Sequence, residues 1–359
     1  MSFPKILLII SVGLFALIGA AAVIKKTTQK EAMPIYSATV QKSQASVFQK
    51  RDVKKERNEK IKEELVPLKA VSVENSSAKI EKTPSLANDQ KAFSAMSDES
   101  GFPNVDRIHR LFTTGPNKLP IVETITYSTN VPWLKGRPAW IADYASFYST
   151  SRHFIARSLN GKPDYFSQKI SPGSRFNVFR KDKDIQFYLL VDLSRCKMAF
   201  YYIDMATNER TLLKTYRVGL GRLDENNASK SSTPTGKYKL GSKVAIYKPG
   251  IMGLYKDQPT EMIQVFGTRW IPFEQEIEAE VPAKGYGIHG APWILNQSRG
   301  VLVENRDCIG KYKGDGCVHL ALEDMEELFA IIITKPTVVH LVDDFRAAQL
   351  PGHESKSSK

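Results

Sequence analysis

Hydrophobic and polar positions divide this chain of 359 residues into five stretches of different character. Residues 6–24 form an apolar run without a charge, long enough for one membrane-spanning helix. Ala20-Ala21-Ala22 offers small residues for cleavage, but the apolar run continues past it to Ile24, which favours an uncleaved anchor over a signal peptide. We therefore predict a membrane anchor or signal-anchor over residues 1–24.

Residues 25–100 are polar and charged, with few aromatic side chains. Such a segment cannot bury enough apolar surface to offset the entropy lost on folding. A short charged helix is compatible with residues 47–65, ending before Pro67. For the whole of residues 25–100 we predict a disordered charged tether.

Residues 101–183 alternate between strand and helix patterns. Val122–Tyr127 alternates like a strand, and two helical patterns follow over residues 138–148 and Arg152–Leu159. After the turn Pro172-Gly173, Arg175–Phe179 reads as a second strand. This order resembles a LysM carbohydrate-binding module. A small α/β cap packed on the following domain is the alternative.

Short strand patterns dominate residues 184–345. Residues 187–191 and 197–202 predict a hairpin around Asp192–Arg195. An amphipathic helix is expected over Glu323–Ile332. Further strands are expected at 213–218, 244–247, 262–266, 286–289 and 337–342. We predict a mainly β domain of the sandwich type, with one late helix, followed by a polar tail over residues 346–359.

The net charge is +13, from 51 Lys and Arg against 38 Asp and Glu. This balance favours anionic partners, such as carboxylates, lipid head groups or nucleic acid. The sequence has no helix-turn-helix, RNP or zinc-finger spacing, so no nucleic acid partner is expected. It also has no His, Cys or Asp cluster with zinc spacing, and we expect neither a metal nor another cofactor.

Two residues beside glycines carry the candidate chemistry: His289 before Gly290, and Cys317 after Gly316. A thiolate is a strong nucleophile, and a neutral imidazole can remove the thiol proton. Gly316 allows a tight turn in which free backbone N–H groups could stabilise an oxyanion. Each residue alone is more often structural, because a lone cysteine behaves as a small buried hydrophobe.

Together, these residues resemble the catalytic domain of the L,D-transpeptidases (YkuD type). That family carries His-Gly and, further on, Ser-x-Gly-Cys-[Ile/Val]-Arg-[Met/Leu], which His289-Gly290 and Gly316–Leu320 match in part. Thr233–Tyr238 matches a third segment, Thr-Pro-x-Gly-x-[Phe/Tyr]. Two positions depart, since Gly314 replaces the Ser and His319 replaces the Arg. The loop between the two main motifs is also longer than usual, and the resemblance covers residues 186–343.

The resemblance implies that Cys317 attacks the carbonyl that joins the third residue of a tetrapeptide stem to its terminal D-alanine. A thioester acyl-enzyme then forms, the amine of a second stem resolves it, and His289 handles the protons. The implied oxyanion or substrate-binding residues are Gly316, Gly290, His319 and Asp315. His319 could bind a substrate carboxylate in place of the family's Arg, or could only order the loop.

The same resemblance implies peptidoglycan tetrapeptide stems as donor and acceptor, and carbapenem-type β-lactams as inhibitors. Glycan strands would bind through residues 101–183. The expected location is the cell envelope, with residues 6–24 in the inner membrane and the catalytic domain in the periplasm or outside the membrane.

Two other functions stay open at this stage. One is a hydrolase, an L,D-carboxypeptidase or endopeptidase, that uses the same cysteine and histidine with water as acceptor. The other is a non-catalytic wall-binding protein. The three cysteines leave at least one free thiol, and in an oxidising compartment Cys308 could pair with Cys196.

Overall fold

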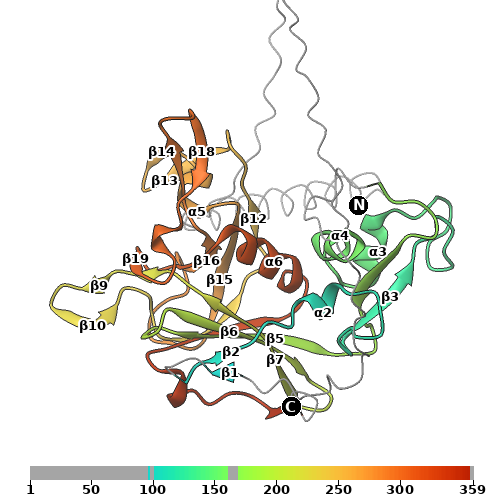
Figure 1. Cartoon of the computed structure of the whole chain (residues 1–359), viewed down its shortest axis with the longest axis horizontal. Coiled ribbons are helices and arrows are strands. Elements are labelled where there is room, and N and C mark those ends of the chain that lie inside the picture. The colour runs from blue at the N-terminus through green and yellow to red at the C-terminus, as the bar shows by residue number, and fades with distance from the viewer. Residues whose placement is uncertain (1–95, 98–100, 161–168, 356–359) are drawn as a thin grey trace, which may run out of the picture. The chain divides into compact units, whose positions relative to one another are not determined.

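The computed structural model describes residues 96–97, 101–160 and 169–355, and most of them belong to a domain built on one large sheet (Figure 1). The ten strands of this sheet are β5 (Ile185–Asp192), β6 (Lys197–Asp204), β7 (Glu209–Arg217), β11 (Gly236–Leu240), β12 (Ala245–Ile246), β15 (Arg269–Glu278), β16 (Gly287–Gly290), β20 (Val318–Leu320), β21 (Thr337–Val342) and β22 (His353–Glu354). Their order across the sheet is β20-β16-β15-β11-β21-β5-β6-β7-β22, with β12 paired to β15.

The predicted hairpin of β5 and β6 lies inside the sheet, between β21 and β7, and its strands pair antiparallel from Ile185↔Asp204 to Asp192↔Lys197. Its turn is closed by the buried carboxylate of Asp192, which accepts hydrogen bonds from the Ser194 hydroxyl at 2.8 Å and from the Arg195 backbone N–H at 2.9 Å. β21 lies parallel to β5, so the predicted last strand is buried beside the first hairpin.

One long strand joins the two halves of the sheet. The second half of β15 pairs with β11, whereas its first half pairs with β12 and β16. The prediction of a mainly β domain is confirmed, but the strands form one curled sheet, whereas two stacked sheets were expected. The reason is β15 itself, whose ten residues were not recognised as one strand because Pro272 and three glutamates interrupt the apolar pattern.

Helix α6 (Leu322–Ile332) covers one face of the sheet beside β15 and β16. Its buried side chains are Met325, Leu328, Phe329, Ala330, Ile331 and Ile332. Each fully buried Leu, Ile, Phe or Met contributes about 1.5–3 kcal/mol relative to an exposed one. The packing of this helix therefore stabilises the strands that carry the candidate site.

The N-terminal module has the predicted order of strand, two helices and strand: β3 (Val122–Thr126), α3 (Ile141–Phe147), α4 (Arg152–Asn160) and β4 (Arg175–Phe179). β3 and β4 pair antiparallel, and the module has a hydrophobic cluster of its own around Tyr144 and Phe176. It also packs on the larger domain, since α4 contacts α6. In addition, the Phe179 ring contacts both the Phe154 ring of the module and the Phe187 ring of β5. The LysM resemblance stays a prediction.

The remaining elements are short. They are β1 (Met96–Ser97), β2 (Pro103–Asn104), α2 (His109–Phe112), β8 (Leu220–Gly221), β9 (Leu223–Asp224), β10 (Asn227–Ser231), β13 (Met252–Tyr255), β14 (Gln258–Glu261), α5 (Ile263–Phe266), β17 (Trp293–Asn296), β18 (Val301–Glu304), β19 (Tyr312–Gly314) and two 3₁₀ turns, Arg306–Cys308 and Phe345–Ala347. β1 pairs with β2, so folded structure begins inside the segment that was predicted to be tether.

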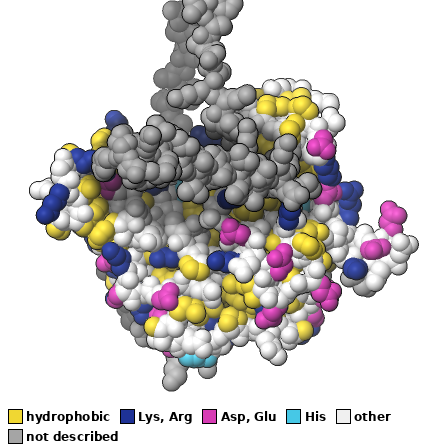
Figure 2. Space-filling model, turned by 180° about the vertical axis from the view of Figure 1, so that it is seen from behind, with side chains coloured by type: hydrophobic (Ala, Val, Ile, Leu, Met, Phe, Trp, Pro, Cys, Tyr) yellow, Lys and Arg dark blue, Asp and Glu magenta, His cyan; other side chains and the backbone are white. Residues whose placement is uncertain are grey.

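Two hairpins project beside the candidate site, β13–β14 and β17–β18, and both contact α5. The second hairpin accounts for the long loop between the histidine and cysteine motifs. Apolar side chains gather on these hairpins, at the upper right of Figure 2. The exposed ones are Ile251, Met252, Leu254, Ile294, Leu295 and Val301.

Three further expectations from the sequence have different outcomes in the structure. Residues 262–266 are not a strand, because Ile263–Phe266 forms the helical turn α5, which Gly267 ends at a φ of 60°. The disulfide that Cys196 and Cys308 could have formed is absent, and both residues are free thiols. The expected anchor at residues 6–24 lies outside the described residues, among which no helix is long and apolar enough to cross a membrane.

Candidate active site

Two neighbouring parallel strands, β16 and β20, bring the histidine and cysteine motifs together. The register pairs Ile288 with Val318 and His289 with His319. Cys317 comes one residue before Val318, so it lies at the start of β20, diagonally across from His289. Since side chains alternate along a strand, Cys317 and His319 point to the same face as His289.

The backbone turns just before the cysteine, at Gly316, with a φ of +124° that L-residues rarely adopt. A Cβ here would lie 2.7 Å from the Tyr286 ring and 2.8 Å from the Ser232 carbonyl oxygen. Glycine is thus required by both conformation and space. This local constraint sets the position of Cys317 at the mouth of β20.

The thiol of Cys317 is protonated at rest. Its Sγ donates to the Gly285 carbonyl oxygen at 3.7 Å. Desolvation by burial raises its pKa to about 11, more than the backbone hydrogen bond from Gly287 lowers it. Thiolate formation at neutral pH therefore needs a base that accepts the proton as the sulfur reacts.

His289 has the properties of such a base. It is only 4% exposed, and burial holds its pKa well below the usual value, with the nearby His319 acting in the same direction. Its Nδ1 lies 2.9 Å from the Gly290 carbonyl oxygen, which assigns the proton to Nδ1 and leaves Nε2 as the acceptor. Gly290 thus orients the imidazole through its carbonyl group.

An aromatic cage fixes the ring further. The Phe266 and His319 rings meet the His289 ring edge-on at centroid distances of 5.3 and 4.4 Å, and Trp270 lies at 5.7 Å. Phe266 belongs to α5, Trp270 to β15 and His319 to β20, so three separate elements hold one imidazole. The site combines a buried neutral base with a protonated thiol on adjacent strands.

Comparison with known proteins agrees with this geometry. The family model of the L,D-transpeptidase catalytic domain, YkuD, matches residues 186–341. Residues 186–341 belong to the YkuD family of L,D-transpeptidase catalytic domains. The match ends within two residues of the 186–343 expected from the motifs.

Two solved structures share weaker similarity with the chain. Bd1075 of Bdellovibrio bacteriovorus is 14% identical, with a TM-score of 0.32, over 50% of this chain and 52% of that one. The helical cell shape determining protein Pgp2 from Campylobacter jejuni is 15% identical, with a TM-score of 0.29, over 47% of this chain and 50% of its own. The chain thus covers about half of the length of each. No curated protein matches its sequence.

Within the matched domain, His319 is buried, only 5% exposed. Burial lowers its pKa to about 4, so the ring is uncharged at neutral pH. Its Nδ1 has no hydrogen-bond partner among the described residues, a cost of about 1–3 kcal/mol in a buried site. A neutral, buried ring favours the loop-ordering role over that of a cation for a substrate carboxylate.

Asp315 is held by cations of the protein itself. Its carboxylate forms ion pairs with Arg222 and with Lys256, the latter at 2.7 Å, and accepts a hydrogen bond from the Tyr255 hydroxyl at 3.3 Å. These contacts lower its pKa to about 2. Asp315 therefore ties the cysteine loop, residues 315–317 between β19 and β20, to the tip of the β13–β14 hairpin. Sequence spacing did not reveal this role.

The Thr-Pro-x-Gly segment contacts the cysteine loop indirectly, through Gly221. The Thr233 hydroxyl accepts a hydrogen bond from the Gly221 backbone N–H at 2.7 Å. A Cβ on Gly221 would lie 2.8 Å from the Gly316 Cα. Gly221 therefore has to be a glycine for the backbone to approach the loop before Cys317 this closely.

A pocket of about 360 Å³ opens beside this contact. It is lined by Arg222, Leu223, Asp224, Lys230, Ser231, Ser232 and Asp315. Asp315 is two residues from Cys317, so the pocket lies beside the segment that leads to the cysteine. The pocket offers both charges and hydroxyl groups to a polar chain.

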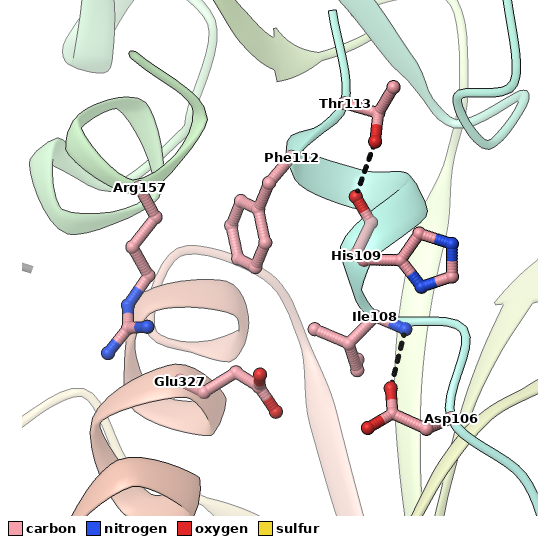
Figure 3. A pocket seen from close by; sticks show the side chains of 7 residues that line it. All are labelled: Asp106, Ile108, His109, Phe112, Thr113, Arg157 and Glu327. Carbon is pink, nitrogen blue, oxygen red and sulfur yellow. Dashed lines mark hydrogen bonds between the residues drawn. The ribbon is translucent and has the colours of Figure 1, made fainter. Parts of the chain in front are cut away.

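A second polar pocket of about 420 Å³ lies between α2, α4 and α6 (Figure 3). Arg157 reaches from α4 toward Glu327 on α6. Burial raises the pKa of Glu327, although Lys214 and the Tyr216 hydroxyl bind its carboxylate at 2.7 and 3.1 Å. Sequence analysis gave no sign of this cluster, which lies at the junction of the N-terminal module and α6.

Proposed function

We propose that the protein is a peptidoglycan L,D-transpeptidase that joins stem peptides through an acyl-enzyme on Cys317. The observation that carries the proposal is the parallel pairing of β16 and β20, in which a buried neutral imidazole lies next to the strand that directly follows Cys317. The family match over residues 186–341 supports the same reaction class.

In the first half-reaction, Nε2 of His289 accepts the thiol proton while the Cys317 sulfur bonds to the carbonyl carbon of the third stem residue. The C–N bond to D-alanine then breaks, and the imidazolium returns the proton to the departing amine. In the second half-reaction, the side-chain amine of another stem attacks the thioester. His289 takes a proton from that amine and returns it to the sulfur.

The oxyanion of each tetrahedral intermediate needs fixed donors in a site of low dielectric. The backbone N–H groups at Gly316 and Cys317 are the nearest candidates, because Gly316 places them at the turn. The pocket lined by Arg222, Lys230 and Ser232 suits the polar, charged stem that must lie across the thiol.

The envelope location is part of the proposal. It rests on the apolar run at residues 6–24 and on the place where such stems occur. Glycan binding by the N-terminal module is proposed on its strand, helix, helix, strand order. Trp140 supports this, because 66% of its surface is exposed, and exposed aromatic rings serve as contact surfaces for ligands.

The test is the product made from a purified tetrapeptide stem, analysed by mass spectrometry. A transpeptidase yields free D-alanine and a dimer joined between third residues. A tripeptide without dimer would identify a carboxypeptidase and contradict the proposal, and unchanged substrate would favour the non-catalytic alternative.

A further inference from the structure

The two departures from the family motif lie against each other in space. A Cβ added to Gly314 would lie 2.2 Å from Cε1 and 3.0 Å from Nδ1 of His319. The backbone of Gly314 has no positive φ that would demand glycine. The absence of a side chain is therefore explained by the His319 ring, which occupies the space that the family's serine would need.

The His319 ring has little freedom to move away. Its backbone exchanges two hydrogen bonds with Gly219, both at 2.9 Å. A Cβ on Gly219 would lie 3.2 Å from the Cβ of His319, so this side is closed as well. The ring is held between Gly314 on one side and His289 on the other.

The His319 ring also contacts the ring of His289, the proposed base. The two rings are nearly perpendicular, at 87°, with centroids 4.4 Å apart. Phe266 meets the His289 ring at 84° and 5.3 Å. His319 therefore supplies a wall of the cage that sets the plane of the base and excludes water from it.

We propose that His319 is a positioning residue for His289, and that Gly314 is its partner, kept free of a side chain to admit the His319 ring. The proposal rests on the proposed roles of Cys317 and His289. It replaces the idea that His319 contacts a substrate carboxylate, because the ring packs against the base and the loop backbone.

The charged and titratable groups around the pair are few. From the loop before β20 they are Cys317 and Asp315, and Asp315 is itself bound by Arg222 and Lys256. β15 and α5 contribute the uncharged rings of Trp270 and Phe266. The protonation of His289 thus depends mainly on its burial, to which the His319 ring contributes together with Phe266 and Trp270.

The test measures alkylation of Cys317 by iodoacetamide in the full-length chain, with each cysteine resolved by peptide mass spectrometry. Gly314→Ser should slow alkylation at pH 7 about 10-fold to 100-fold, the scale of a misplaced catalytic group. Gly115→Ser is the matched control, since a Cβ there meets only a Thr113 methyl at 3.7 Å and needs no positive φ.

Removing the ring should relieve the clash. Gly314→Ser with His319→Ala should react as fast as His319→Ala alone. If the double variant were slower than both single variants, the two positions would be independent and the coupling refuted. Should His319→Ala fail to fold, His319→Asn replaces it in both measurements.

Positioning also predicts a change that a purely structural role would not produce. In His319→Ala, water reaches His289, so its imidazole should titrate at higher pH in NMR, and alkylation should fall more at pH 6 than at pH 8. His353→Ala, an exposed histidine, is the control. An unchanged His289 titration would overturn the proposal. Loss of crosslinking with these alkylation results intact would instead refute the proposed function alone.

Discussion

At the scale of single residues, the two proposed catalytic groups are both uncharged at rest. Burial raises the pKa of Cys317 to about 11 and lowers that of His289 well below its usual value. A resting thiolate–imidazolium pair is therefore not favoured. The proton must move as the sulfur attacks, which makes the orientation of the imidazole decisive.

This arrangement predicts the behaviour of His289→Ala. Transfer should fall at least about 100-fold, the usual contribution of one general base. His319→Ala should lose less, because it disturbs the base without removing it. Steady-state kinetics on a tetrapeptide stem would check both, and a larger loss in His319→Ala would contradict the assignment of the base.

The proposed activity of the native protein should also tolerate mild acid. An ordinary imidazole would lose about threefold of its neutral form between pH 7 and pH 6. Because the pKa of His289 is lowered, its neutral form persists across that range, and kcat/KM should fall by less. A decline with a midpoint near the ordinary histidine value would show that His289 is solvated in solution.

At the scale of elements, the sequence predicted those whose pattern is local. Strands Arg175–Phe179 and Thr337–Val342 and the β5–β6 hairpin are confirmed, because alternation and turn residues specify them directly. Ile263–Phe266 was mistaken for a strand because a short apolar run fits either period. The contact between Gly314 and His319 could not be predicted, because it depends on how β8, β19 and β20 meet.

One prediction concerns the β13–β14 hairpin. Asp315→Asn removes the ion pair with Lys256, which holds the hairpin tip to the cysteine loop, and the ion pair with Arg222, which follows β8. The pairs are exposed, so stability should change by about 1 kcal/mol or less, while KM for the stem should rise. Urea unfolding and kinetics would measure the two effects.

Asp182→Asn is the matched control, because it removes an exposed ion pair with Arg180 far from the site in the fold. The Asp315 pairs are present above the carboxyl's unfolded pKa and are lost only as pH falls through about 2. They should therefore not contribute to any change in stability or KM between pH 5 and pH 8. If Asp315→Asn had the KM of the native protein, the contact between Asp315 and the hairpin would not contribute to substrate binding.

At the scale of the whole molecule, the proposed catalytic residues lie in one compact unit, residues 85–359. The N-terminal module packs on α6 through α4, and Phe154 and Phe179 belong to the main hydrophobic core. The module should therefore stabilise the domain even if it also binds glycan.

Deletion of residues 1–84 should leave a soluble protein whose Cys317 reacts with iodoacetamide at the native rate. The reason is that every described contact of the site lies within residues 219–320. Deletion of residues 1–183 should fail to fold, since it exposes the core around Phe187. Light scattering and alkylation would check both, and a slow thiol in the first deletion would place part of the site in the N-terminal segment.

The central claim is that Cys317 forms the acyl-enzyme. Its most direct test is to incubate the full-length protein with a carbapenem-type β-lactam or a tetrapeptide stem, quench in acid and map the adduct by peptide mass spectrometry. We predict a single adduct, on Cys317, that Cys317→Ala abolishes and His289→Ala slows. An adduct on Cys308 or Cys196, or an unchanged yield in Cys317→Ala, would contradict the account.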